Sequence, residues 1–526
     1  MNRRAIAVLV CLSALVVAGA WWWSARSPRW NVVLITLDTT RADHLGCYGC
    51  SSDMTPNIDR LASESAVFER AYTVVPITLP AHATMLTGKL PPEHSLRING
   101  VSRLADSVPT LAEILQQQEY QTGAFVSSLV LDARFGLARG FDNYNDRLAN
   151  GPDGPRAERS AAETVAAAMA WLNRLAPEPF FCWVHFYDPH EPYDEHRELF
   201  EDQFAGRPYD AEIAYMDRHI GRLLDSLQRT GVEDRTLILI AGDHGEGLGD
   251  HDEATHGYLA YNATMHVPLL IRQPGPEHRG LRVAAPVSLV DIFPTILDSL
   301  QIDRTSASTG RSLLPYWRHS SLASRACYGE TEAPLMEGGW CPLRTWTTDR
   351  WKYIQSTKPE LYDLQADPDE NNNVVDQHPA EVAALSQELT DLESQLILNR
   401  GANAVLSEQE QRALASLGYT GGTEVADRER DTPRRDIKET LKYAEQVHQC
   451  MHLIDRNEFD KAQQILTEVI EALPDYSKAW GTLGVCFARQ EDYPAAERNF
   501  REAIDLDSNQ NFARIGLGRA QGQRAL

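Results

Sequence analysis

The sequence lacks an excess of positive charge. Its 526 residues include 50 lysines and arginines against 74 aspartates and glutamates, which gives a formal net charge of −24 at pH 7. Nucleic acids and anionic membrane surfaces attract proteins through basic side chains, so this balance argues against both as partners of the protein body. The length favours two or three domains over a single core.

Cysteine is scarce and forms no recognisable framework. Among the eight cysteines, Cys47 and Cys50 form a C-x-x-C pair, but no second pair follows to complete a metal site. Cys327 and Cys341 are candidates for a disulfide bond in an oxidising compartment. Three others lie in apolar patterns that predict buried thiols: Cys182, Cys450 and Cys486.

A basic flank precedes a long apolar run at the N-terminus. Residues 5–23 are almost wholly apolar and long enough to span a bilayer, and Arg3 and Arg4 favour a cytoplasmic N-terminus. Ala18-Gly19-Ala20 would also suit cleavage of a signal peptide. We therefore expect residues 1–24 to be a membrane anchor or, alternatively, a signal peptide. Both predict an exported body, periplasmic or extracellular, which is secreted if the segment is cleaved.

Three apolar runs predict buried parallel strands at residues 31–37, 179–186 and 235–242. Ligands of open α/β sheets gather where such strands end. The pattern predicts an α/β fold with a central, mostly parallel sheet flanked by helices. Polar side chains follow the three runs: Asp38, His190, Asp243 and His244.

Residues 74–88 predict a short helix with a hydroxyl group at its start. Thr78 precedes Pro80, which suits the first helical turn, and Thr87-Gly88 end the helix. The free N–H groups and dipole of a helix N-terminus favour an anion. Taken alone, Thr78 would more often be a simple helix cap.

Together with the strand ends, this segment resembles the nucleophile segment of the alkaline phosphatase and sulfatase superfamily. In formylglycine sulfatases it reads Cys/Ser-x-Pro-Ser/Ala-Arg and runs into Leu-Thr-Gly. Pro80 and Leu86-Thr87-Gly88 match, whereas Thr78 replaces the convertible Cys or Ser and His82 replaces the Arg. Threonine cannot become formylglycine, so the resemblance implies the Thr-nucleophile branch, which handles phosphoryl groups, and no formylglycine.

The resemblance also implies a metal site. In the family, the first two metal ligands along the chain are a pair of adjacent aspartates. This sequence has Asp38 at the first of these positions and Thr39 at the second. A lysine that formylglycine sulfatases have near residue 256 is missing here. Oxygen and nitrogen donors together favour Zn²⁺ or Mn²⁺, with Ca²⁺ and a second metal ion both possible. The implied metal ligands are Asp38, Thr78, Asp243 and His244.

Histidines supply the remaining catalytic candidates. His190 stands in a Pro-His-x-Pro pattern that resembles the family's substrate histidine, and His256 follows His244 by 12 residues, as in the phosphoethanolamine-transferase branch. We expect catalysis to involve Thr78 and these histidines, together with His82. Weaker candidates for substrate contacts are His185, His94, Arg97, Asn99 and Thr39.

The resemblance implies a catalytic domain over residues 30–400, with a smaller C-terminal subdomain from about residue 320 that includes antiparallel strands near 350–354 and 360–364. Residues 420–436 are polar and charged, which predicts a linker. In residues 437–526 a pattern recurs every 34 residues and resembles tetratricopeptide repeats, which implies a protein partner. Residues 34 apart match in type, as in Phe459 with Tyr493, Ala462 with Ala496, and Ala479 with Ala513.

The predicted function is that of an exported, metal-dependent hydrolase or transferase. It would cleave phosphate or sulfate esters, as small molecules or in the cell envelope, through a metal-bound Thr nucleophile. A sulfatase that works without formylglycine is the nearest alternative, and a catalytically silent scaffold acting through its helical repeats is another. The sequence leaves open the physiological substrate, the acceptor and the oligomeric state.

Overall fold

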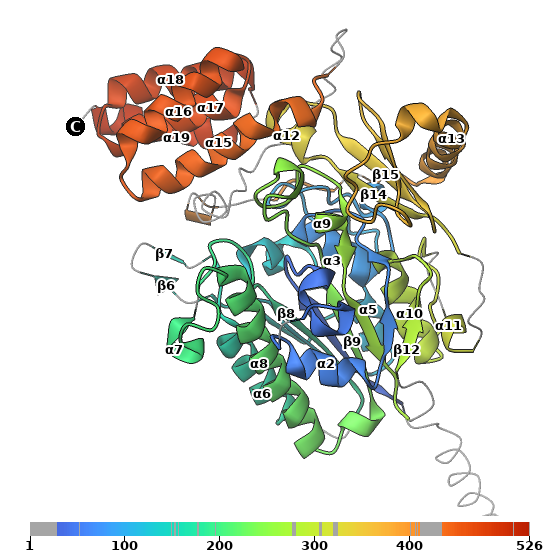
Figure 1. The fold of residues 1–526 in the computed structure, drawn as a ribbon. Helices are drawn as coiled ribbons and strands as arrows, with labels where there is room; N and C mark the ends of the chain where they lie inside the picture. Colours follow the sequence, from blue (N-terminus) through green and yellow to red (C-terminus); the bar gives the residue numbers. More distant parts are fainter. Residues whose placement is uncertain are drawn as a thin grey trace, which may run out of the picture.

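The computed structural model describes residues 29–526 apart from 52, 149, 152–153, 156, 176–177, 195, 276–279, 304–307, 319–323, 400, 405–406, 408, 411–433, 509 and 525–526. Figure 1 shows an α/β body, a β-rich subdomain beside it and a set of helices at the C-terminal end. The predicted anchor and all but the last three residues of the predicted linker lie outside the described residues. No helix in the described part of the chain combines the length and apolar character needed to cross a bilayer.

The body is built on an eight-stranded sheet of order β12-β2-β11-β9-β1-β8-β4-β5. At its centre β1 (Asn31–Leu37) pairs in parallel with β8 (Phe180–Phe186) and β9 (Thr236–Gly242), and all three strands are fully buried. Leu37 lies beside both Phe186 and Gly242, so the three strands end together. This confirms the predicted sheet and brings the residues after these strands to one edge.

The flanking strands extend the sheet on both sides. β11 runs antiparallel to β9 and β2, whereas β4 and β5 continue the parallel pairing next to β8. The bounds are β2 (Ala66–Phe68), β4 (Gln121–Phe125), β5 (Asn143–Asn145), β11 (Leu269–Arg272) and β12 (Leu281–Val283).

Helices cover both faces of the sheet (Figure 1). Successive side chains of a strand point to opposite faces, so Val32 and Leu34 of β1 belong to one core and Val33 and Ile35 to the other. The first core includes α3 (Thr78–Thr87), α5 (Leu111–Gln117) and α10 (Ile292–Ser299). The second includes α2 (Pro56–Ala62), α6 (Ala161–Leu172) and α8 (Pro208–Arg229).

The smaller subdomain is a four-stranded antiparallel sheet with one long helix, α13 (Pro379–Gln395), packed on it. Its last two strands confirm the predicted antiparallel pair. The strands are β14 (Cys327–Thr331), β15 (Leu343–Thr347), β16 (Trp351–Gln355) and β17 (Glu360–Asp363).

Among the described residues from 434 onward there are five helices, and each packs against the next. Their bounds are α15 (Ile437–Asp455), α16 (Phe459–Ala472), α17 (Ser477–Arg489), α18 (Tyr493–Leu506) and α19 (Asn511–Arg524). The starts of α16 and α18, and those of α17 and α19, are 34 residues apart, so the repeat period is confirmed. Assignment to the tetratricopeptide family stays a prediction.

The helical region packs on the body. Ile437 and Leu441 of α15 share a buried cluster with Val75 beside α3, and the ring of Tyr476 lies 4.9 Å from that of Trp340. Asp436, the last residue of the predicted linker, is buried and accepts hydrogen bonds from the subdomain. The helices therefore meet the body through a continuous core.

The predicted disulfide is wrong, because Cys327 and Cys341 are both free thiols. In the β14–β15 register Cys327 lies opposite Thr347, while Cys341 lies just beyond the other end of the pair, where Thr331 faces Leu343. Four residues of strand span about 13 Å, more than a disulfide can bridge. The three predicted buried thiols are confirmed: Cys182, Cys450 and Cys486.

Candidate active site

Two carboxylates stand at the strand ends. Asp38 follows β1, Asp243 follows β9, and both are fully buried. Asp243 Oδ1 accepts hydrogen bonds from the backbone N–H groups of His244 and Thr39, at 2.7 and 3.2 Å. Within the described residues, Asp38 Oδ1 and Asp243 Oδ2 have no hydrogen-bond partner. Buried carboxylate oxygens of this kind call for a cation or a proton.

Helix α3 brings Thr78 to the same place. The helix begins at Thr78, directly after the extended residue Ile77, and the Thr78 side chain is buried. Its Oγ1 lies 3.3 Å from His244 Nε2. Asn99 Oδ1 accepts a hydrogen bond from the Leu79 N–H at 2.8 Å, so Asn99 caps the first turn and the Thr78 hydroxyl is left facing the strand ends.

The His244 ring directs a nitrogen lone pair toward the Thr78 hydroxyl and the two carboxylates. Its Nδ1 lies 2.9 Å from the carbonyl oxygen of Gly245, which assigns the ring proton to Nδ1 and leaves Nε2 unprotonated. Nε2 is 3.7 Å from Asp38 Oδ1 and 3.6 Å from Asp243 Oδ2. Two carboxylate oxygens, an imidazole nitrogen and the Thr78 hydroxyl thus converge.

The electrostatics of the cluster fit a divalent cation. Burial, then the charge of Asp243, raises the pKa of Asp38, and burial also raises the pKa of Asp243. Burial lowers the pKa of His244. A cation between these groups would reverse the two carboxyl shifts and would favour the neutral His244 ring that burial already favours. The mixed oxygen and nitrogen donors suit Zn²⁺ or Mn²⁺.

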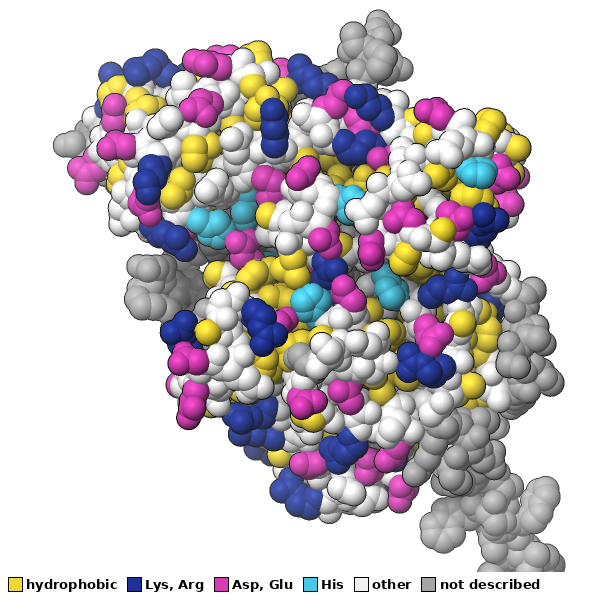
Figure 2. Space-filling view, viewed as in Figure 1, with side chains coloured by type: hydrophobic (Ala, Val, Ile, Leu, Met, Phe, Trp, Pro, Cys, Tyr) yellow, Lys and Arg dark blue, Asp and Glu magenta, His cyan; other side chains and the backbone are white. Residues whose placement is uncertain are grey.

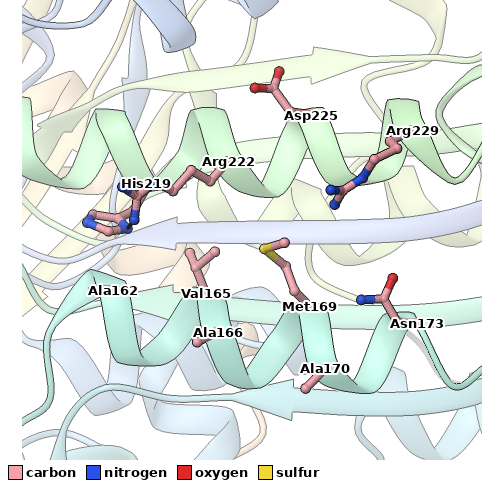
Figure 3. A pocket seen from close by; sticks show the side chains of 10 residues that line it. All are labelled: Ala162, Val165, Ala166, Met169, Ala170, Asn173, His219, Arg222, Asp225 and Arg229. Atoms are coloured by element: carbon pink, nitrogen blue, oxygen red, sulfur yellow. Dashed lines mark hydrogen bonds between the residues drawn. The ribbon is translucent and has the colours of Figure 1, made fainter.

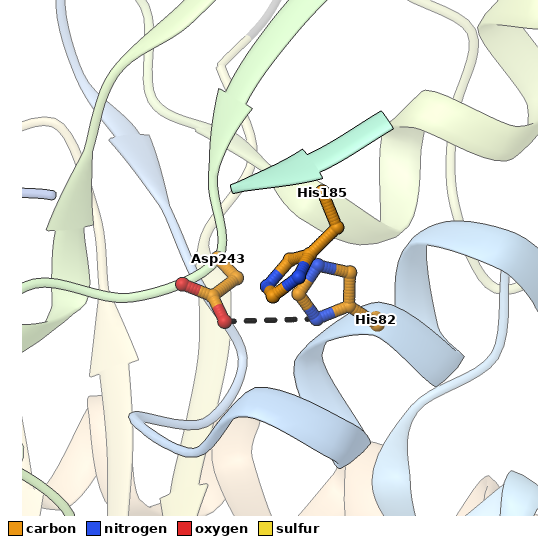
Figure 4. A group of neighbouring side chains, drawn as sticks. All are labelled: His82, His185 and Asp243. Carbon is orange, nitrogen blue, oxygen red and sulfur yellow. Dashed lines mark ion pairs between the residues drawn. The ribbon is translucent and has the colours of Figure 1, made fainter. Parts of the chain in front are cut away.

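Figure 4 shows a second group, in which His82, His185 and Asp243 lie together. His82 Nδ1 is 2.7 Å from the carbonyl oxygen of Thr78 and 3.6 Å from Asp243 Oδ2, while its Nε2 is 2.9 Å from the hydroxyl of Thr36. Both ring nitrogens of His82 are therefore already within hydrogen-bond distance of other groups of the protein. Burial lowers the pKa of His82 to about 4, so the ring is neutral and holds α3 against β1.

His185 is engaged in a similar way. Its Nδ1 accepts a hydrogen bond from the Ser127 N–H at 3.3 Å, which assigns the ring proton to Nε2. That N–H donates to Asp38 Oδ2 at 3.1 Å. His185 thus orients the carboxylate whose other oxygen faces the cluster, and we assign it to positioning Asp38.

His190 and His256 lie beside the cluster. The centroid of the His256 ring is 4.4 Å from that of His244 and 5.2 Å from that of His190. His190 stacks on Tyr187 at 4.2 Å, and its Nδ1 is 2.7 Å from the carbonyl oxygen of Glu191. The structure thus brings both predicted histidines to the edge where Thr78 lies.

Sequence reasoning missed Glu246 and Tyr193. Glu246 Oε1 is 3.0 Å from His256 Nδ1, and its Oε2 accepts a hydrogen bond from the Tyr193 hydroxyl at 2.9 Å. Burial raises the pKa of the Glu246 carboxyl and lowers that of His256 to about 3. Both directions favour the neutral pair, with the proton on the Glu246 carboxyl. The signal available in the sequence was the acidic residue two positions after His244.

The weaker candidates have varied surroundings. The Thr39 hydroxyl donates to the Pro189 carbonyl at 2.8 Å and links two strand-end loops, and Asn99 Nδ2 is buried without a partner in the described residues. His94 bonds the Thr84 hydroxyl and the Leu96 N–H. Arg97 pairs with Glu330 and Glu332. The structure brings Asn99 to the start of α3, whereas His94 and Arg97 are engaged in contacts that suit structural roles. Their substrate contacts stay predictions.

A surface pocket elsewhere contains none of the predicted site residues. Figure 3 shows it between α6 and α8, lined by small and apolar side chains of α6 and by polar side chains of α8. His219 and Arg222 are among the latter. The pocket brings no carboxylate pair or nucleophile together.

The parallel sheet and the residues at its strand ends are typical of hydrolases with the alkaline-phosphatase-like fold. The family model "Sulfatase" matches residues 30–302, and the model "N-sulphoglucosamine sulphohydrolase, C-terminal" matches residues 255–395. The first match covers more than half of the chain, and the protein belongs to the sulfatase family. The protein is therefore a hydrolase of this family.

Individual proteins agree. The sulfatase YidJ of Escherichia coli is 26% identical over 422 residues, which cover 66% of this chain and 83% of that protein. The ulvan-active sulfatase of Formosa agariphila is 27% identical over 395 residues, 66% of this chain and 77% of that protein. The crystal structure of the phosphonate monoester hydrolase of Agrobacterium radiobacter has a TM-score of 0.59 at 25% identity, covering 70% of this chain and 96% of that one.

Proposed function

We propose that this protein cleaves phosphate esters with Thr78 as the nucleophile, as a hydrolase or as a transferase. The observation that carries the proposal is that Thr78 Oγ1 lies at the start of α3, 3.3 Å from His244 Nε2 and beside the unpartnered oxygens of Asp38 and Asp243. Threonine cannot become formylglycine, and the similar phosphonate monoester hydrolase supports chemistry at phosphorus.

In the first step, the Thr78 hydroxyl releases its proton to solvent and Oγ1 forms a bond to phosphorus as the bond to the leaving oxygen breaks. A divalent cation held by Asp38, Thr78, Asp243 and His244 would supply the charge that lowers the pKa of the hydroxyl and neutralises the phosphoryl oxygens. The buried Nδ2 group of Asn99 is a further donor for those oxygens. His82 and His185 hold the helix and Asp38 in position.

His256 supplies the proton for the leaving oxygen. Its Nδ1 lies 3.0 Å from Glu246 Oε1. We assign the proton of this contact to the carboxyl, whose pKa burial raises, which leaves the ring proton of His256 at Nε2. His256 donates that proton as Glu246 restores one at Nδ1. His190 takes part by orienting the ester. Water or a second alcohol then attacks the phosphorus as the bond to Thr78 Oγ1 breaks. Its proton passes to His256 Nε2 while the proton at Nδ1 returns to Glu246. With water the enzyme is a hydrolase, and with an alcohol it is a transferase.

Hydrolysis of sulfate esters is the second candidate. The family model and the two relatives that are named sulfatases favour it. However, Thr78 and His82 replace both residues on which formylglycine chemistry depends. A sulfatase built on this site would need to use threonine directly.

A catalytically silent scaffold that acts through its helices is the third reading. It would leave the unpartnered oxygens of Asp38 and Asp243 buried for no purpose, which costs stability. The retained donor set counts against it.

We also propose that the enzyme is exported and held to the membrane by residues 1–24, or secreted if that segment is cleaved. The apolar run and its basic flank support this location. The 34-residue helical period supports a protein partner for residues 437–526. The substrates would then be small or envelope phosphate esters outside the cytoplasm.

Side-by-side assays test the proposal. The full-length protein, loaded with Zn²⁺ or with Mn²⁺, is assayed with matched aryl phosphate, phosphodiester and sulfate esters, beside Thr78→Ala and Thr84→Ala as a control in the same helix. We expect higher kcat/KM for phosphorus esters, loss of turnover in Thr78→Ala and retention in Thr84→Ala. Faster sulfate hydrolysis would favour the second candidate, and absence of turnover with every ester would favour the scaffold.

A further inference from the structure

A cluster of two imidazoles and a carboxylate lies where the helical region meets the body. His448 and His452 are one turn apart on α15, and Glu191 belongs to the loop that follows β8. Figure 2 shows histidine side chains along the line between the helical region and the body. The exposed fractions of the three side chains are 23%, 32% and 31%, so an ion from solvent can reach them.

The distances suit a tetrahedral metal ion. His448 Nε2 is 3.2 Å from His452 Nε2, 3.5 Å from Glu191 Oε2, and His452 Nε2 is 3.9 Å from Glu191 Oε1. Zn–N bonds of about 2.0–2.1 Å at the tetrahedral angle hold two ligand atoms about 3.3 Å apart. Histidines at positions i and i+4 of a helix, joined by a distant carboxylate, form a common zinc-ligand set.

A hydrogen bond between the two rings explains less of this arrangement. It would use one proton between the two Nε2 atoms and leave the carboxylate with only a long contact of 3.5 Å to His448 Nε2, while His452 Nε2, at 3.9 Å, is beyond hydrogen-bond distance. One divalent ion would satisfy all three groups, and with two neutral imidazoles and one carboxylate the site would hold a net charge of about +1.

We propose that Glu191, His448 and His452 bind a divalent cation, with Zn²⁺ as the best fit, that joins α15 to the loop after β8. Glu191 places this ion next to the catalytic edge, because its own carbonyl oxygen accepts the hydrogen bond from His190 Nδ1 at 2.7 Å. The ion therefore fixes the backbone that orients His190. That last link rests on the proposed function of His190, whereas the metal binding does not.

The metal ion bound by Glu191, His448 and His452 would give the helical region a role in the enzyme. The ligands come from parts of the chain more than 250 residues apart, and the ion ties them at the edge of the site. Movement of α15, for example on binding of a partner, would pull on Glu191 and thus on His190. His448 and His452 are positioning residues in this scheme.

Metal counting tests the proposal without turnover. The full chain, without a histidine tag, is stripped with chelator, reloaded with Zn²⁺, desalted and analysed for zinc per chain. The double variant His448→Gln/His452→Gln is compared with wild type, and the same pair of substitutions is compared within an Asp243→Asn background. His378→Gln, a partly exposed histidine of the subdomain, is the control.

We expect the stoichiometry to fall by one zinc ion per chain in both backgrounds, and to be unchanged by His378→Gln. Glu191→Gln is expected to weaken the binding of the same zinc ion. Zn²⁺ is expected to raise the Tm of Asp243→Asn. It is expected to leave the Tm of the triple variant Asp243→Asn/His448→Gln/His452→Gln nearly unchanged. Equal zinc content with and without the two imidazoles would overturn the proposal, whatever the outcome of the ester assays. Circular dichroism of the stripped proteins checks that the variants fold.

Discussion

Removing the carboxyl proton from the Glu246–His256 pair should slow the enzyme in a way that depends on the leaving group. In Glu246→Gln the amide can still accept a hydrogen bond from Tyr193 and donate one to His256 Nδ1, so the ring keeps its place. However, the amide cannot pass a proton to the ring. His256, whose pKa burial holds at about 3, then has no proton to replace the one it gives away.

The magnitude follows from the geometry. When Glu246 begins to transfer its proton before Nε2 has released its own, the ring gains positive charge, and a carboxylate about 4 Å away stabilises a full charge of that sign by about 4 kcal/mol at an effective dielectric constant of 20. That corresponds to about a thousandfold in rate and lies within the range of about 10²–10⁴ for general acid catalysis. We therefore expect kcat to fall about 10²–10³-fold for an alkyl phosphate ester.

An aryl ester with a strongly acidic leaving group needs little protonation. Its kcat should fall less than about tenfold in the same variant. The assay is kcat against leaving-group pKa for wild type and Glu246→Gln, with Glu253→Gln as control. Glu253 is also buried, but it accepts hydrogen bonds from the N–H groups of Tyr258 and Leu259. An equal loss for alkyl and aryl esters would refute the role assigned to this pair.

The raised pKa of Asp243 also predicts how stability depends on pH, and two substitutions test other parts of the account. In metal-stripped protein the folded pKa of Asp243 exceeds the unfolded value, so its stabilising effect is fully present below the unfolded pKa and is lost as pH rises through the folded pKa. Asp243→Asn should therefore raise the Tm of stripped protein at pH 8, because the free energy of unfolding that the wild type loses grows by about 1.4 kcal/mol for each pH unit between the unfolded and the folded pKa. No gain in Tm is expected near pH 4, and a gain at both pH values would contradict this. Thr78→Ser should keep measurable turnover, whereas Thr78→Ala should lose it at unchanged Tm. Gly484→Ala should destabilise the helical region by about 1–3 kcal/mol in urea, because a Cβ there would lie 2.7 Å from the Phe500 ring; an unchanged midpoint would show that the ring can move.

Sequence patterns predicted the centre of the fold better than its edges. β1, β8 and β9 are buried on both faces, so they read as unbroken apolar runs, and the polar residues after them marked the site. β5 carries no comparable signal, since its three residues Asn143–Asn145 show no apolar alternation. An edge strand of this kind is specified by its neighbour, here β4.

The site residues also differ in how well the sequence predicted them. Asp38, Thr78, Asp243 and His244 stand in local patterns that a sequence displays, and the structure brings them together. Glu246 was overlooked, because its contact with His256 depends on how the loop after β9 folds back. The Glu191–His448–His452 cluster joins distant segments, and the false disulfide shows the same limit, since spacing in a sequence does not give a distance.

Mass spectrometry of the enzyme mixed rapidly with a phosphate ester and quenched in acid shows whether Thr78 becomes phosphorylated during turnover. The account predicts a peptide containing Thr78 that gains the mass of one phosphoryl group, with the gain lost in Thr78→Ala. A protein that turns the ester over with no adduct on Thr78, or with an adduct on another residue, would contradict it.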